Sequence, residues 1–258
     1  MQNLAEEYEF LMILGIVLFF VAVGSLITWF FTHPTSRSYV LGYEGIVGPF
    51  FGLPAVLFSL TAALMATSLW ENYNVANKSV RTESQGIGEI IDLASTIPSL
   101  KGSSLAADAK RYAKSVVEDE WTTLSSHGEY SPITKGYYET LRQATYQAVD
   151  SLGNTAESKA LMSAIQLVSN GRMTRLAFVS FDVHPVRWYA IIILAVLVQL
   201  VVAFVHLTKP KALIMAMVIA TATVLVPICT IAFTLSSPYV GVISISNSPF
   251  QQLMKLAE

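Results

Sequence analysis

Residues 47–70, VGPFFGLPAVLFSLTAALMATSLW, form an apolar run that leads directly into the polar residues 71–97, ENYNVANKSVRTESQGIGEIIDLASTI. The apolar run is long enough for a helix to cross about 30 Å of hydrocarbon at about 1.5 Å per residue. The polar stretch keeps a helical pattern that is interrupted only by Gly86 and Gly88 and is stopped by Pro98. We therefore predict one long helix that spans the membrane and continues into water.

Three further apolar runs have a similar length, one before this helix and two after the polar middle of the chain. They are Phe10–Phe31, Arg187–Leu207 and Lys211–Leu235. The first run is longer than the apolar core of a signal peptide and follows glutamates rather than lysine or arginine, so we expect it to be retained as a transmembrane helix. The four runs predict a multi-pass membrane protein that contacts the lipid bilayer.

Composition agrees with this class and excludes several others. Hydrophobic residues make up 53% of the chain and charged residues only 13%, as expected when helices face lipid. A net charge of −2 gives no basic surface for nucleic acid. The single cysteine, Cys229, excludes a disulfide framework or a multi-cysteine metal site within one chain. The histidines are scattered, and motifs for nucleophilic catalysis or phosphate binding are missing, so we expect no enzyme, no metal and no cofactor.

Two predicted spans precede the polar middle and two follow it. This arrangement places both termini and the polar middle on one side of the membrane. We predict transmembrane helices 1 and 2 in residues 1–73, a soluble helical domain in 74–185, transmembrane helices 3 and 4 in 186–235, and a C-terminal tail in 236–258. We place the soluble domain in the cytoplasm. The tail is expected to pack on that domain or on a neighbouring subunit. The fold class is therefore an all-α membrane protein with a helical bundle between its second and third spans.

Capping signals divide the polar middle after Pro98 into three more helices. The first starts at Ser103 or Ser104 and runs to about Ser126, before Gly128. The second begins with Ser131 and Pro132 and closes near Gly153. The third starts at Thr155 and runs toward Phe181, with apolar residues at helical spacing.

The tail has a different pattern from the polar middle. Tyr239–Ser246 alternates apolar and polar residues like a short strand. Ser248 and Pro249 are then expected to start a small amphipathic helix through Leu256.

Two faces of the second span are chemically distinct. Small side chains follow one face at helical spacing: Ala55, Ser59, Ala63 and Ala66. Leucines form a separate stripe: Leu53, Leu57, Leu60 and Leu64. Both faces are compatible with helix packing. Alternatively, one of them lines an ion pathway that has an apolar constriction.

Charged groups in the predicted spans and in the polar middle suggest no further site. No lysine, arginine, aspartate or glutamate lies deep in a span, which disfavours a coupled transporter. In the polar middle, Glu118, Asp119 and Glu120 are consecutive and point in different directions on a helix, so they make a poor calcium cage. We predict a solvated face for these carboxylates.

The order of several short motifs resembles a bacterial group of bestrophin-like membrane proteins. The resemblance covers about Gly48 to Leu256 and rests on a collinear set of motifs rather than on one of them. At the end of the second span the motif residues are Trp70, Glu71 and Tyr73, followed by Glu83 on the helix after it. The polar middle adds Tyr112 before Glu120 and Trp121, and then Arg172 and Arg175 in the stretch 171–175 before the third span. After the fourth span come Pro238 and Gly241, which lead to Ser248–Phe250.

This resemblance implies a pentamer with a central ion pathway lined by the second helix of each subunit. Counting back from Trp70 places the narrow neck of that pathway near Gly52, Val56 and Leu60. The small-residue face adds Ser59 and Ala63 to the candidate lining. The chain departs from animal bestrophins in lacking aromatic residues at these neck positions, although Phe50, Phe51 and Phe58 are close. It also lacks the acidic cluster after the fourth span on which a calcium clasp depends, so calcium gating is not expected.

Two functional hypotheses follow. The first is a homo-oligomeric, pentameric ion channel of the bacterial inner membrane that conducts small ions, mainly anions, through the second helix of each subunit. The alternative is a non-conducting membrane scaffold or accessory subunit that binds a partner protein through its soluble helices. Apolar pore linings and packing faces look alike in a sequence, so both hypotheses stay open at this point.

Overall fold

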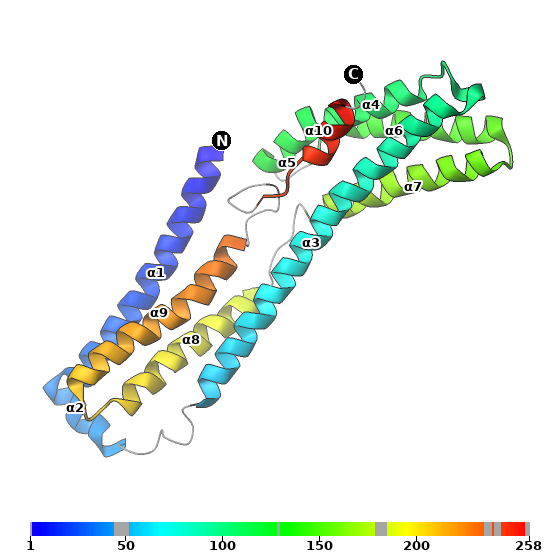
Figure 1. Cartoon of the computed structure of the whole chain (residues 1–258). Helices are drawn as coiled ribbons and strands as arrows, with labels where there is room; N and C mark the ends of the chain where they lie inside the picture. The colour runs from blue at the N-terminus through cyan, green and yellow to red at the C-terminus, as the bar shows by residue number, and fades with distance from the viewer. Residues whose placement is uncertain are drawn as a thin grey trace. The chain divides into compact units, whose positions relative to one another are not determined.

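The computed structural model describes residues 2–43, 52–127, 130–178, 185–234, 239 and 244–255. Over these residues the chain is helical and contains no strand, which confirms the predicted all-α fold (Figure 1). The helices are α1 (Gln2–Thr32), α2 (Pro34–Val40), η1 (Leu41–Tyr43), α3 (Gly52–Thr96), η2 (Pro98–Leu100), α4 (Leu105–Ser115), the π-helical turn η3 (Val116–Glu120), α5 (Trp121–His127), α6 (Pro132–Leu152), α7 (Ala156–Ala177), α8 (Pro185–Val205), α9 (Pro210–Thr234) and α10 (Ser248–Lys255).

The chain divides into two compact units. We call Asn3–Trp70 with Asp182–Ser236 the membrane unit. We call Glu71–Phe181 with Ser237–Glu258 and Met1–Gln2 the polar unit. Helix α3 contributes its first part to the membrane unit and the rest to the polar unit.

In the part of the chain that the structure describes, four helices are long and apolar enough to cross a membrane. They are α1 from Phe10 to Thr32, α3, α8, and α9 from Pro210 to Ala232. The predicted spans are therefore confirmed as helices of suitable length and composition. Helix α3 is described from Gly52 onward, and the predicted start of this span, Val47, lies outside the described residues together with Gly48 and Pro49.

Gly52 and Pro54 do not interrupt the second span. Both lie in the first turn of α3. Proline is tolerated there because the first backbone N–H groups of a helix have no partner inside that helix. From this turn α3 runs for 45 residues to Thr96, which confirms the predicted continuous helix.

The membrane unit is held together by apolar side chains from its four long helices. Phe20, Phe58, Ile191 and Ile228 are among the buried residues of one cluster, and Phe31, Ala203 and Leu213 belong to a second one. The connection between α1 and α3 contains a helix that the sequence did not predict, α2, which begins at Pro34 in the position that favours proline.

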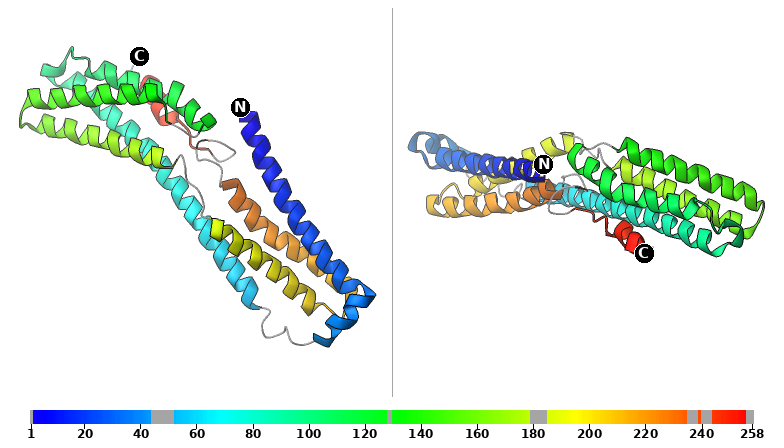
Figure 2. Two further views of the ribbon diagram at one scale, coloured as in Figure 1. Left: turned by 180° about the vertical axis from the view of Figure 1, so that it is seen from behind. Right: turned by 90° about the horizontal axis from the view of Figure 1, so that it is seen from above.

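In the polar unit, α4, α6 and α7 lie side by side with the second half of α3 (Figures 1 and 2). Two of the predicted N-terminal caps are present. The Ser131 hydroxyl accepts a hydrogen bond from the Thr134 amide at 3.4 Å, and the Thr155 hydroxyl accepts one from the Ser158 amide at 3.1 Å. Gly153 ends α6 with a φ of 62°, which a residue with a side chain rarely adopts.

Two details of the polar unit differ from the sequence prediction. Helix α7 ends at Ala177 instead of continuing toward Phe181, and residues 179–184 lie outside the described part. The Ser104 side chain stands at the start of α4 without making a capping hydrogen bond.

The tail forms the predicted amphipathic helix but not the predicted strand, as far as the structure describes it. Ser244–Asn247 have no regular structure, and residues 240–243 lie outside the described part. Helix α10 packs on α4 and buries Phe250 completely. The alternation of apolar and polar residues in Tyr239–Ser246 therefore does not mark a strand over its described portion.

Candidate functional site

Within the membrane unit, α3 has a packed face and an exposed face. Phe58, Ala62, Met65 and Leu69 recur at helical spacing and are between 5% and 7% exposed. These residues pack α3 against the buried core of the membrane unit. The rest of the helix surface is left for contacts outside this unit.

All the predicted pore-lining residues lie on the exposed part of α3. Val56 is 62% exposed and Leu60 is 55% exposed. Gly52, Ser59 and Ala63 are also exposed. None of them contributes to the buried core of the single chain.

A groove beside α3 separates these residues into two groups. It has a volume of about 450 Å³ and is bordered by α3, α8 and α9. Ser59 and Ala63 line the groove, facing Thr223 and Pro227 of α9. Val56, Leu60 and Gly52 do not line it. The small-residue face and the neck positions are thus neighbouring but distinct surfaces of one helix.

The motif at the end of the second span lies where α3 enters the polar unit. Trp70 is 59% exposed, and Glu71 is exposed as well. Tyr73 packs partly against the core of the polar unit. Glu71 is the first charged residue of α3, so the helix has no formal side-chain charge from Gly52 to Trp70.

Deep in the polar unit, four charged motif residues meet in one buried cluster, which we call the ion-pair cluster: Glu83, Glu120, Arg172 and Arg175. Arg172 binds the Glu120 carboxylate through two hydrogen bonds of 2.7 Å. Arg175 donates to Glu120 Oε2 at 2.7 Å, to Glu83 Oε2 at 2.7 Å and to Glu83 Oε1 at 3.0 Å. Each carboxylate is matched by a guanidinium group, so the cluster has no net charge.

Aromatic residues surround the ion-pair cluster. The Tyr112 hydroxyl donates to Glu83 Oε1 and accepts from Arg172 Nη1 at 3.1 Å. From the tail, the Tyr239 hydroxyl donates to the backbone carbonyl of Arg175 at 2.7 Å. The Arg175 guanidinium carbon lies 6.0 Å from the ring centroids of both Trp121 and Phe250. The cluster thus connects α3, α4, η3, α7 and the tail.

The π-helical turn η3 explains how Glu120 reaches the cluster. In a regular α-helix, residues 112 and 120 would point about 80° apart. The wider turn over Val116–Glu120 reduces this angle, so that Tyr112 and Glu120 both bind Arg172. Our prediction of a solvated face was wrong for Glu120, which is fully buried, whereas Glu118 is exposed and Asp119 is half-buried. Two arginines far away in sequence make this burial possible.

Electrostatic interactions within the cluster keep the Glu120 carboxylate ionised. Burial alone would raise the pKa of Glu120, but the guanidinium groups of Arg175 and Arg172 outweigh it and hold the pKa below its usual value of 4.5. Burial, together with the Glu83 carboxylate, raises the pKa of Tyr112 well above 10.0, so its hydroxyl stays protonated and can donate. Burial also raises the pKa of Tyr239.

Two glycines allow α7 to lie close enough to α3 for these bonds. A methyl group at Gly171 would come within 2.6 Å of the Glu83 backbone nitrogen. A methyl group at Gly86 would come within 2.7 Å of the Ala164 carbonyl oxygen. The motif stretch 171–175 therefore supplies both the close approach and the two arginines.

The ion-pair cluster is suited to holding helices together. Within the described parts of the chain, no group of three or more histidine, cysteine, aspartate or glutamate residues could hold a metal ion. Glu83, Glu120, Trp121, Arg172 and Arg175 are brought together, whereas Trp70 and Glu71 stand apart on α3. Pro238 and Gly241 lie outside the described residues.

One polar contact in the membrane unit was not anticipated. Gln199 of α8 is fully buried, and its Nε2 donates to Thr221 Oγ1 of α9 at 3.0 Å and to the Phe20 carbonyl of α1 at 3.4 Å. The signal in the sequence was a lone amide within an apolar span, a residue that usually bonds across helices. Its partners cannot be identified from the sequence alone.

Comparison with known proteins places the chain in a family. No curated protein matches it. A crystal structure described as that of a membrane protein is similar in fold, with a TM-score of 0.65 and 10% sequence identity over 93% of this chain and 96% of the other. The family model described as "Bestrophin-like domain" matches residues 18–250. Because that match covers most of the sequence, the chain belongs to the bestrophin-like family.

Proposed function

We propose that this membrane protein is a homo-oligomeric ion channel, a pentamer in which the exposed face of α3 from each subunit lines a central pathway. Gly52, Val56 and Leu60 form the narrow part of this pathway. Ser59 and Ala63 lie next to the neck, at the contact with neighbouring helices. The permeant ions are small anions.

The observation that supports the proposal best is the division of α3 into two faces. One face is buried in the membrane unit, while the neck positions Val56 and Leu60 are 62% and 55% exposed. Such a helix can pack within its own subunit and still present apolar side chains to an axis. A ring of apolar side chains narrows a pore and gates it by dewetting.

Charge along α3 favours anions over cations. The helix has no acidic side chain between Gly52 and Trp70 that could form the carboxylate ring typical of cation channels. In addition, its N-terminal end begins near Gly52, and helix N-termini favour negative charge. A ring of such ends would attract anions toward the neck.

We further propose that the protein resides in the bacterial inner membrane with its polar unit in the cytoplasm. The short connections after α1 and after α8 then face the opposite side. In this arrangement the polar unit surrounds the cytoplasmic continuation of the pathway. The lipid bilayer, other copies of the chain and the permeant ions are its partners.

Reconstitution into liposomes tests the proposal directly. The purified protein is expected to conduct chloride more strongly than sodium in flux assays. Val56→Ala and Leu60→Ala should each raise the flux, because a smaller side chain widens and wets the constriction. Mass measurement in detergent should give a pentamer.

Leu18→Ala provides a matched control, because Leu18 lies on α1 and is 59% exposed, close to Leu60 in exposure. Its flux should equal that of the unmodified protein. A monomer or dimer without flux of either ion would contradict the channel and favour the scaffold hypothesis. Equal effects of Leu18→Ala and Leu60→Ala would place the pathway elsewhere.

A further inference from the structure

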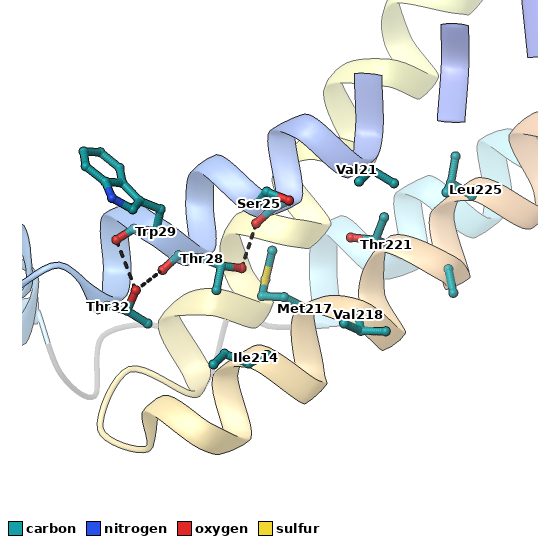
Figure 3. Close-up of a pocket in the computed structure, with 12 residues that line it drawn as sticks. Val21, Ser25, Thr28, Trp29, Thr32, Ile214, Met217, Val218, Thr221 and Leu225 are labelled. Carbon is teal, nitrogen blue, oxygen red and sulfur yellow. Dashed lines mark hydrogen bonds between the residues drawn. The ribbon is translucent and has the colours of Figure 1, made fainter. Parts of the chain in front are cut away.

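A second pocket lies in the membrane unit, away from the proposed pathway. It occupies about 590 Å³ between α1 and α9 (Figure 3). This volume is within the range of about 300–1,000 Å³ that is typical of small-molecule sites. Its lining is mainly apolar, with Val21, Ile214, Val218 and Leu225 among the lining residues.

A line of hydroxyl groups runs along the α1 side of this pocket. Ser25, Thr28 and Thr32 recur at helical spacing and all line it. Thr28 and Thr32 donate their protons to the Gly24 and Thr28 carbonyls at 2.7 and 2.8 Å, so their oxygens keep acceptor capacity. The Ser25 hydroxyl has no hydrogen bond to the residues that the structure describes.

The α9 side of the pocket adds one positioned hydroxyl. Thr221 Oγ1 accepts the 3.0 Å bond from Gln199, so it retains its own proton for donation. The Gln199 Oε1 atom is buried and has no hydrogen-bond partner in the described part of the chain. Gln199 itself does not line the pocket, so Thr221 supplies the unused donor on this side, and an unused donor is costly inside a membrane.

A glycine brings the two sides together. A methyl group at Gly24 would lie 2.7 Å from Thr221 Oγ1 and 3.4 Å from Gln199 Nε2. Gly24 also lines the pocket, and its missing side chain allows α1 to approach Thr221 closely. The hydroxyls of α1 and α9 therefore border the same space.

The lining also defines the charge of a ligand. Among the described residues that line the pocket, none is a lysine, arginine, histidine, aspartate or glutamate. A charged head group would be desolvated without a counter-ion, which is unfavourable in hydrocarbon. A hydroxyl group, in contrast, both donates and accepts, so it can bond the Ser25 hydroxyl and accept the unused proton of Thr221.

We propose that the pocket between α1 and α9 binds a neutral membrane amphiphile with a hydroxyl head group. The head group bonds Ser25, Thr28 and Thr221, and the apolar chain lies against Val21 and Leu225. Trp29, which is 58% exposed near the C-terminal end of α1, also lines the pocket. This site does not depend on ion conduction.

Photolabelling of the full chain in phosphatidylcholine liposomes tests the site. The probe is a monoacylglycerol that carries a diazirine in its acyl chain. Adducts should concentrate in the peptides that contain residues 21–32 and 214–225. Unlabelled monoacylglycerol should compete, whereas the methyl ester of the same fatty acid, which lacks the hydroxyls, should not.

Variants separate hydrogen bonding from simple contact with lipid. Ser25→Ala should reduce labelling roughly three- to tenfold, as expected for the loss of one hydrogen bond. Ala222→Phe, which fills the pocket from α9, should abolish it, and Val226→Phe, at a position that is 68% exposed on the same helix and outside the lining, should leave it unchanged. Equal competition by the methyl ester, or adducts spread evenly over α8, would overturn the proposal.

Discussion

Arg175 of α7 binds the carboxylate of Glu83 on α3 through two hydrogen bonds of 2.7 and 3.0 Å, although 92 residues separate them in sequence. Both side chains are fully buried. A buried charge that loses its partner is costly, because its desolvation is no longer offset. This ion pair therefore holds the polar part of α3 against α7.

Glu83→Gln should destabilise the protein strongly, since it leaves the buried Arg175 with only one carboxylate. Breaking a buried pair of this kind costs about 3–5 kcal/mol. Thermal unfolding in detergent, followed by circular dichroism, measures the loss. Glu118→Gln is the matched control, because Glu118 pairs with Lys114 at 3.7 Å on the exposed surface, where such pairs contribute about 0–1 kcal/mol. Similar effects of both changes would argue against the role of the cluster.

Gly171→Ala should separate α3 from α7 and lower the unfolding temperature. The new methyl group would lie within 2.6 to 2.8 Å of Glu83 backbone and Cβ atoms, which cannot move without shifting the helix. Gly136→Ala makes the same chemical change in α6, where nothing lies within 4 Å. Because alanine favours helix by about 1 kcal/mol over glycine, that variant should be neutral or more stable. Both unfolding temperatures are measured side by side.

The tail should contribute to the stability of the polar unit. Phe250→Ala removes a fully buried ring that lies 6.3 Å from the Trp121 ring, and such truncations cost about 3–5 kcal/mol. The neighbouring Gln251 is exposed, so Gln251→Ala should have little effect. Limited proteolysis should cut the tail of the Phe250 variant faster than that of the Gln251 variant. Equal rates would show that α10 is not held by its ring.

Stability should depend on pH at both extremes. The pKa of Glu120 is lowered in the folded protein, so its contribution is complete above pH 4.5 and is lost as the pH falls below that value. The pKa of Tyr112 is raised, so its contribution is complete below pH 10.0 and is lost as the pH rises above it.

Unfolding temperatures measured across pH, with two variants, check these assignments. Glu120→Gln should flatten the acidic decline and Tyr112→Phe the alkaline one, each in a less stable protein. An unchanged slope in either variant would assign that decline to other groups.

Membrane orientation can be tested with single cysteines in a Cys229→Ala background. Tyr39 in α2 is 76% exposed and Tyr146 in α6 is 45% exposed, so both positions accept a reagent. In intact cells, an impermeant maleimide should label Tyr39→Cys and should not reach Tyr146→Cys. After the cells are opened, both should react. The reverse pattern in intact cells would refute the cytoplasmic polar unit.

The helices could be predicted from the sequence because their signals are local. The length of an apolar run sets a span, and residues such as Ser131, Gly153 and Thr155 mark helix ends through their own backbone preferences. Continuity of α3 across Gly86 followed from the absence of proline between Pro54 and Pro98. These features depend on neighbours within one or two turns.

The ion-pair cluster could not be derived from local patterns. The resemblance named Glu83, Glu120, Arg172 and Arg175, but nothing in the spacing showed that they meet. Glu120 looked like one of three solvated acids, because the π-helical turn that directs it inward has no distinctive sequence. Its burial is decided by guanidinium groups 52 and 55 residues away.

The order in which the cluster is joined has a consequence for how the protein is made. Glu83 leaves the ribosome long before either arginine, and Tyr239 and Phe250 follow only after α8 and α9 have been synthesised. Domains generally fold as their parts emerge during synthesis. The polar unit therefore receives its last buried contacts only after both late membrane helices exist. Translation of the final span thus precedes completion of a unit whose largest segment begins at Glu71.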